Sequence, residues 1–182
     1  IPNSVTSIGE GAFQGCTSLT SITIPFVGTD RNATGYSSHF GILFGYGYRT
    51  YSSDDCHYPT VSKSYYYSIP DSLKTVVISN GGITIGDFAF RNCKGLESIT
   101  IPKSVTAVGR RAFYGWKSSQ TIYCMATSKP SGWDSEWAYW CYANIAWGYS
   151  GQQSKNAQAE LSTISLPVSE KKREDDLRMT IA

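Results

Sequence analysis

Residues 86–102 decide the fold, and they read Gly-Asp-Phe-Ala-Phe-Arg-Asn-Cys-Lys-Gly-Leu-Glu-Ser-Ile-Thr-Ile-Pro. The pattern returns 23 residues later, at 109–124, as Gly-Arg-Arg-Ala-Phe-Tyr-Gly-Trp-Lys-Ser-Ser-Gln-Thr-Ile-Tyr-Cys. It also opens the chain at 9–25, as Gly-Glu-Gly-Ala-Phe-Gln-Gly-Cys-Thr-Ser-Leu-Thr-Ser-Ile-Thr-Ile-Pro. A fixed period of this length is typical of a solenoid, in which each unit packs on its neighbours. We therefore expect a long regular surface rather than one deep pocket.

Each unit ends in an alternation of apolar and small polar residues, which predicts a short β-strand. The strands of stacked units would pair as a parallel ladder. Pro25 and Pro102 would end their strands, because proline cannot donate to the ladder. The positions expected to face inward are Ile22 and Ile24, Val76 and Ile78, Ile99 and Ile101, and Ile122 and Cys124.

Each unit also carries a glycine shortly before an Ala-Phe pair, at 12–13, 89–90 and 112–113. This arrangement predicts a tight bend into one helical or 3-10 turn, with the alanine and phenylalanine pointing inward. Cys16 and Cys93 follow three residues after their phenylalanines, on the same face of the turn. We expect both cysteines to act as small buried hydrophobic residues.

The string at 4–25, Ser-Val-Thr-Ser-Ile-Gly-Glu-Gly-Ala-Phe-x-Gly-Cys-x-Ser-Leu-x-Ser-Ile-x-Ile-Pro, closely resembles the BspA-type (treponemal-type) leucine-rich repeat. Residues 1–25 and 73–124 carry the resemblance. It implies a right-handed leucine-rich-repeat solenoid, mostly β with short helical or 3-10 turns, on an extracellular or cell-surface protein. Members of this family occur in bacteria and some protozoa, and they are often described as adhesins or host-protein binders.

The repeat pattern divides the chain into three parts. Residues 1–125 are expected to form a solenoid of about four partial turns, with an insertion at 26–72 that adds about 31 residues to one repeat. Residues 126–150 read as an aromatic C-terminal cap, and 151–182 as a linker or partly disordered tail. Because the chain begins within a repeat and without Met, we expect the C-terminal part of a longer array, with further repeats or domains in the full-length protein.

The insertion interleaves glycines with aromatic residues, among them Tyr46 and Tyr48. One interpretation is a recognition loop for a protein or a glycan, because tyrosine supplies contact area at low entropic cost. In the other interpretation, Phe40, Leu43 and Phe44 pack the insertion onto the solenoid and most of its tyrosines lie over apolar surface. The resemblance favours the second interpretation, since similar insertions recur in related arrays.

The segment 124–149 holds four tryptophans: Trp133, Trp137, Trp140 and Trp147. They would cover the open end of the solenoid core, and a platform of stacked rings for a sugar is the alternative. Residues 130–137 predict a turn into a short helix, capped by Asp134 or Ser135. Residues 145–149 predict a last strand.

Composition narrows the function classes. A net charge of +2 gives no electrostatic case for nucleic acid, and no apolar run reaches the length of a membrane span. The five cysteines permit a Cys124–Cys141 bridge that would close the cap, although the repeat already uses cysteine for packing, and the pairing of Cys56 stays open. His39 and His57 lack the partners of a metal site or a nucleophile, so no catalytic residue, metal or cofactor is expected and an enzyme is the least favoured class.

The candidate partner-binding residues lie on the outward side of the strand ladder and in the insertion. They are Ser21, Thr75, Ser98 and Thr121 in one row, Thr23, Val77, Thr100 and Tyr123 in the next, and Tyr46 and Tyr48. The first hypothesis is an extracellular adhesion module that binds a host or matrix protein or a glycan. The second is a purely structural spacer, and the third is a carbohydrate-binding surface on the tyrosine-rich insertion.

Overall fold

The computed structural model describes residues 1–47, 57–59, 64–81 and 83–151. Chain contacts divide the protein into two units, Ile1–Tyr149 and Ser150–Ala182. Of the second unit, only residues 150 and 151 are described, so the expected tail at 152–182 lies outside the described residues.

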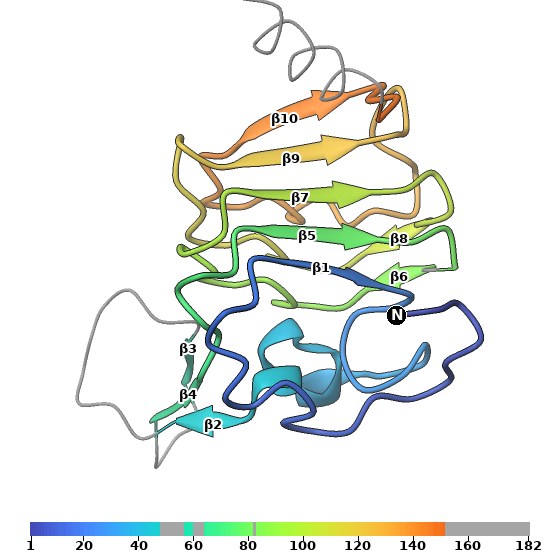
Figure 1. Ribbon diagram of the computed structural model, residues 1–182. Coiled ribbons are helices and arrows are strands. Elements are labelled where there is room, and N and C mark those ends of the chain that lie inside the picture. The colour runs from blue at the N-terminus through green and yellow to red at the C-terminus, as the bar shows by residue number, and fades with distance from the viewer. Residues whose placement is uncertain (48–56, 60–63, 82, 152–182) are drawn as a thin grey trace, which may run out of the picture. The chain divides into compact units, whose positions relative to one another are not determined.

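The first unit is a parallel β-solenoid whose main sheet has the strand order β1-β5-β7-β9-β10 (Figure 1). The strands are β1 (Ser21–Ile24), β5 (Thr75–Ile78), β7 (Ser98–Ile101), β9 (Thr121–Cys124) and β10 (Asn144–Trp147). All four pairings are parallel, and each one aligns the equivalent residues of successive turns. The apolar positions predicted to face inward are all buried. The ladder and the solenoid fold class are therefore confirmed.

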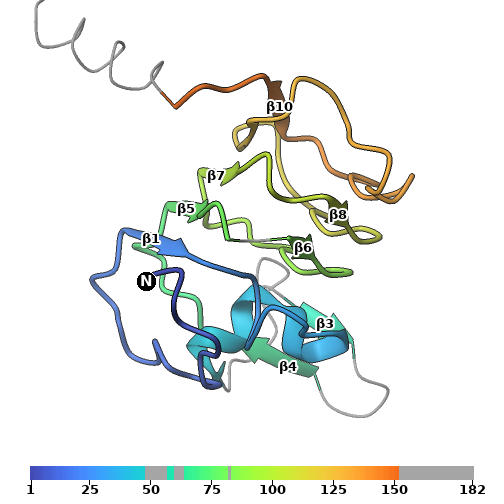
Figure 2. The same cartoon turned by 90° about the vertical axis from the view of Figure 1, so that its right-hand side faces the viewer.

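A second, smaller sheet lies across the core from the first (Figure 2). Its strands β6 (Thr84–Ile85) and β8 (Ala107–Val108) pair in parallel, and Trp133 adds a single bridge to Val108. Ile85, Val108 and Trp133 point inward and are buried. The turns that start at β5 and β7 therefore run from the main sheet to a short strand on the opposite side, and the turn that starts at β9 reaches the single bridge at Trp133.

The bends at 9–15, 86–92 and 109–115 are tight turns, and no helix forms in them. Their amides bond three residues back, as from Arg91 N to Phe88 O at 3.0 Å, or sideways to the next turn, as from Phe90 N to Ala112 O at 2.8 Å. Within the described residues, the 3-10 helices are η1 (Gly35–Ser38) and η2 (Phe40–Phe44), and both belong to the insertion.

The insertion adds a layer to the solenoid on one side only. At the bends, the amides of Gly11 and Phe13 donate to Ile42 O (2.9 Å) and Leu43 O (2.8 Å) of η2. On the other side of η2, Phe40 N donates to Ala89 O at 2.9 Å. In the main sheet, however, β1 pairs directly with β5. Helix η2 is therefore a wedge between the first bend and the second.

Phenylalanines from the bends and the wedge form one column through the core. Successive ring centroids lie 5.9 Å (Phe13–Phe44), 5.3 Å (Phe44–Phe40), 5.0 Å (Phe40–Phe90) and 5.5 Å (Phe90–Phe113) apart. Phe40, Leu43 and Phe44 are completely buried. The prediction that these three side chains pack the insertion onto the solenoid is confirmed.

The rest of the insertion forms an antiparallel sheet with the order β2-β4-β3. Its strands are β2 (Tyr46–Gly47), β3 (His57–Pro59) and β4 (Ser64–Tyr67). Tyr67 is buried and its hydroxyl lies 3.1 Å from Nδ1 of the buried His39. Cys56 lies outside the described residues.

The aromatic segment after β9 packs on the last bend. Trp133 and Trp137 are buried, and the Trp137 ring meets Phe113 edge to face at 5.7 Å. The predicted last strand is confirmed as β10. The short helix expected at 130–137 is wrong, because its backbone pairs with the preceding turn: Asp134 N donates to Val108 O and Glu136 O accepts from Arg111 N.

The cysteines only partly follow expectation. Cys93 is buried as predicted, but Cys16 is exposed, because no further turn covers the outer side of the first bend in this structure. For the same reason Ala12 is exposed rather than inward. Cys124 and Cys141 are free thiols, so the Cys124–Cys141 bridge does not form. Burial raises the pKa of Cys124 to about 12, which keeps the thiol protonated.

The last repeat has Trp116 where the preceding repeat has Cys93, and Ser119 where it has Leu96. Buried hydrogen bonds hold it to the turn before it. Trp116 takes the place of the repeat cysteine, and its indole donates to Phe90 O at 2.8 Å. The buried Gln120 donates to Cys93 O (2.9 Å) and Leu96 O (2.8 Å) and accepts from Lys117 N (2.7 Å). The two donated bonds join the last turn to the turn before it, and the accepted bond closes the tight turn between Lys117 and Gln120.

Candidate binding surfaces

The predicted strand-face residues do come together as two rows. Ser21, Thr75, Ser98 and Thr121 are successive register partners, and so are Thr23, Val77, Thr100 and Tyr123. Ser21 and Thr23 are exposed and most of the others are half-buried, but Thr100 is only 9% exposed. The ring centres of Tyr123 and Tyr149 lie 4.5 Å apart, with the ring planes tilted by 35°. The face is a shallow strip of hydroxyl and methyl groups with Thr100 withdrawn from its surface.

Of the two insertion tyrosines predicted to bind a partner, the structure describes only Tyr46. Tyr48 lies outside the described residues. Tyr46 is described as the first residue of β2, where it is the register partner of Tyr67. Their role as a recognition surface stays a prediction.

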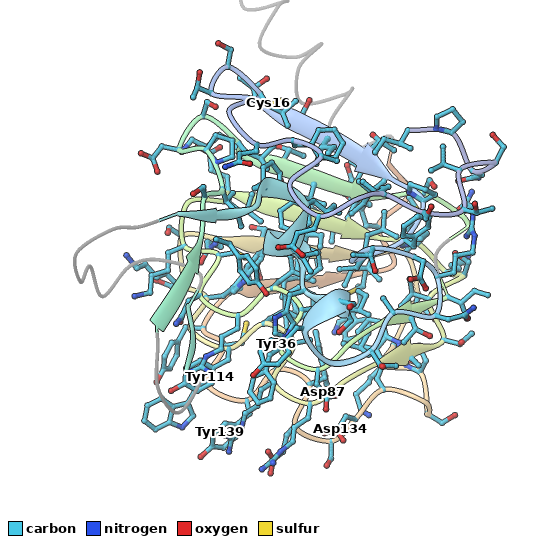
Figure 3. All side chains as sticks on the ribbon, turned by 90° about the horizontal axis from the view of Figure 1, so that it is seen from below. Cys16, Tyr36, Asp87, Tyr114, Asp134 and Tyr139 are labelled. Atoms are coloured by element: carbon cyan, nitrogen blue, oxygen red, sulfur yellow. The ribbon has the colours of Figure 1, made fainter. Side chains whose placement is uncertain are left out.

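Sequence reasoning missed a third surface, on the side of the molecule that faces away from β1 (Figure 3). There, arginines alternate with aromatic rings along the bends. The Arg91 guanidinium lies 5.6 Å from the Phe88 ring centre and 5.1 Å from that of Tyr114. The Arg111 guanidinium lies 4.7 Å from the Tyr139 ring centre. We call this set the aromatic–arginine strip, and it comprises Phe88, Arg91, Arg111, Tyr114, Tyr139 and Trp140.

Ring stacking links the strip into one surface. Tyr114 and Trp140 lie 5.9 Å apart with planes at 7°, and Tyr139 and Trp140 lie 6.1 Å apart at 24°. Trp140 is 57% exposed and Tyr139 is 43% exposed. Mutual stacking of this kind holds the rings in fixed orientations, and the exposed parts of Tyr139 and Trp140 remain accessible to a partner.

Part of the strip sits on strained backbone. Phe88, Arg111 and Trp140 have φ angles of 54°, 53° and 53°, in the left-handed region that costs side-chain-bearing residues roughly 1–2 kcal/mol. The position of Phe88 and Arg111 in the repeat is occupied by Gly11 in the first copy, with φ 68°. Strain of this kind persists where the surroundings enforce it and is common at binding sites.

Charged groups flank the strip at its Arg111 end. Arg110 Nε lies 2.7 Å from Glu136 Oε2, and Arg111 Nε lies 3.5 Å from the same oxygen. The hydrogen bond from Arg110 lowers the pKa of the Glu136 carboxyl, which therefore stays ionised. The pair is solvent-exposed, so it orients side chains more than it stabilises the fold.

Across the described ranges, no three His, Cys, Asp or Glu side chains are grouped as a metal site would require. No helix of the described part has the length and apolar character to cross a membrane.

Comparison with protein families identifies the repeat. The family model of the BspA type leucine rich repeat region (6 copies) matches residues 1–33 and 60–132, which is more than half of the chain. Comparison with curated proteins and with solved structures gave no match. Together with the observed parallel solenoid, the match shows that the chain belongs to the BspA-type leucine-rich repeat family.

Proposed function

We propose that this chain is an extracellular adhesion module that binds a host or matrix protein through the aromatic–arginine strip. The family is consistent with a surface protein-binding repeat module, and leucine-rich-repeat solenoids are typically non-enzymatic binding scaffolds.

The composition and exposure of the strip carry the proposal. Tyrosine, tryptophan and arginine are the residues enriched at the energetic centres of protein interfaces. Here they form one connected surface on successive turns, with Tyr139 and Trp140 exposed and arginines stacked against rings. The strand face, by contrast, offers small side chains apart from Tyr123, most of them half-buried, and none of its eight candidate residues is charged.

The expected result is that the complete chain binds at least one protein in a panel of extracellular-matrix and host-surface proteins, and that the double variant Arg111→Gly/Trp140→Gly loses at least about tenfold in affinity. Glycine relieves the left-handed strain at both positions, so the variant should remain folded. Biolayer interferometry measures the affinities, and circular dichroism checks the fold.

Thr121→Arg provides the control, because it places a long side chain on the strand face, away from the strip. Binding lost in Thr121→Arg but kept in the strip variant would move the site to the strand face. No binder in the panel would overturn the adhesion proposal and favour the structural spacer. Binding to a glycan array alone, abolished by Tyr46→Ala/Tyr48→Ala, would favour the carbohydrate-binding hypothesis.

A further inference from the structure

The insertion contacts the second bend through residues 38–40, which lie against residues 86–89. We call this set of residues the insertion–bend contact. All three of its insertion residues are buried, and Phe40 N donates to Ala89 O at 2.9 Å. His39 occupies the middle of the contact, between the 3-10 helices η1 and η2. A change at this one side chain therefore affects how the whole insertion is held.

The imidazole ring of His39 joins three parts of the molecule. One ring N–H donates to the backbone carbonyl of Asp87 in the second bend. Nδ1 lies 3.1 Å from the hydroxyl of Tyr67 in β4. The rings of Tyr36 in η1 and Tyr67 meet the imidazole edge to face, with ring centres 5.9 and 6.0 Å from its own. Because His39 is only 4% exposed, these contacts take the place of water around the ring.

The surroundings of the ring disfavour its protonated form. Burial, and to a smaller extent the positive charge of Arg91 in the same bend, lower the pKa of His39 from its usual 6.5 to about 4. The hydrogen bond to the Asp87 carbonyl opposes this shift only in part. The carboxylate of Asp87 accepts from Arg110 N at 2.8 Å on the next turn, and the two tyrosine rings against the imidazole are uncharged. A proton on His39 thus adds a second positive charge near Arg91 in a buried site.

The insertion in turn holds the first bend. Gly11 N and Phe13 N donate to carbonyls of η2, at 2.9 and 2.8 Å. The ladder beyond the second repeat has its own support, because β7 pairs with β5 on one side and with β9 on the other. If the insertion–bend contact opens, we therefore expect the wedge and the first bend to loosen while β7 and β9 stay paired.

We propose that the insertion–bend contact is a pH-sensitive switch: acidification protonates His39, and the insertion and the first bend then separate from the second bend. The separated state binds the proton more tightly, so the contact weakens as the pH falls. Its stability is complete above pH 6.5, decreases about tenfold per pH unit below that value, and levels off below about pH 4. Between pH 7 and pH 4.5 the equilibrium constant for separation should rise roughly fifty-fold. This switch goes beyond the proposed function, because it requires no partner.

Amide hydrogen exchange of the complete chain, corrected for the intrinsic effect of pH on exchange, measures the separation. The amides of Gly11, Phe13 and Phe40 should open roughly fifty-fold more often at pH 4.5 than at pH 7, with those of β7 and β9 unchanged. Equal opening of β7 and β9 at pH 4.5 would overturn the proposal, because the response to acid would then be global unfolding.

His39→Gln removes the titrating group but keeps a hydrogen-bond donor and an acceptor, so its response to acid should be at least about tenfold smaller than that of the parent. His57→Gln is the matched control, because His57 is the other histidine of the chain, and it should respond like the parent. An unchanged response in His39→Gln would overturn the proposal.

NMR titration of the His39 ring in the parent chain gives a second test that needs no variant to fold. The ring should stay neutral well below pH 6.5, and an ordinary pKa near 6.5 would also overturn the proposal. Arg111→Gly/Trp140→Gly should keep the acid response of the parent, so failure of the strip and failure of the switch are distinguishable.

Discussion

Phe40→Ala should destabilise the solenoid by about 3–5 kcal/mol, the usual range for truncating a fully buried phenylalanine. Phe40 is completely buried between Phe44 and Phe90, at centroid distances of 5.3 and 5.0 Å. The reason for the large effect is that Phe40 joins the wedge to the second bend, so its loss opens a cavity between two layers. Urea unfolding followed by circular dichroism gives the free energy.

Tyr36→Ala is the matched control, because it truncates an aromatic ring in the same insertion that is 47% exposed. It should cost less than about 1 kcal/mol. Equal small losses for both variants would mean that the insertion does not form a layer of the core, and that the first repeat packs on the second without it.

Gln120→Met should destabilise the last repeat by about 3 kcal/mol, although methionine has nearly the same volume. The substitution removes two donated hydrogen bonds, to Cys93 O and Leu96 O, and one accepted from Lys117 N. The partners that lose their bonds lie in a buried site, where each unpaired group costs about 1–3 kcal/mol. Thermal and urea unfolding measure the loss.

Ser119→Ala changes the exposed neighbour of Gln120 and should leave stability within about 0.5 kcal/mol of the parent. A Gln120→Met variant as stable as the parent would show that packing alone holds the last two turns together. The amide network would then be incidental to the fold.

The regular part of the fold could be predicted from the sequence because two signals coincide there. The 23-residue spacing sets the stacking register, and the alternation around Ile99 and Ile122 sets which side chains face inward. Both signals are local, so neither depends on what lies beside a given turn. For that reason the burial of Cys93 was predictable, whereas the exposure of Cys16 was not: it depends on whether another turn covers the first bend.

The wedge and the aromatic–arginine strip could not be predicted from spacing alone. The insertion has no repeat, so nothing in its sequence shows that η2 would enter the hydrogen-bond ladder between two bends. A signal for the strip did exist: Phe88 and Arg111 occupy a position where the first copy has Gly11, and a bulky residue at a glycine position suggests a function beyond packing.

Hydrogen–deuterium exchange of the complete chain, with and without its tightest-binding matrix or host protein, shows where the partner lies on the solenoid. We predict slowed exchange on binding at the bends 86–92, 109–115 and 134–140, with β1, β5, β7 and β9 unchanged. Slowed exchange confined to residues that flank the strand face, with no change at the bends, would mean that the partner does not bind the aromatic–arginine strip.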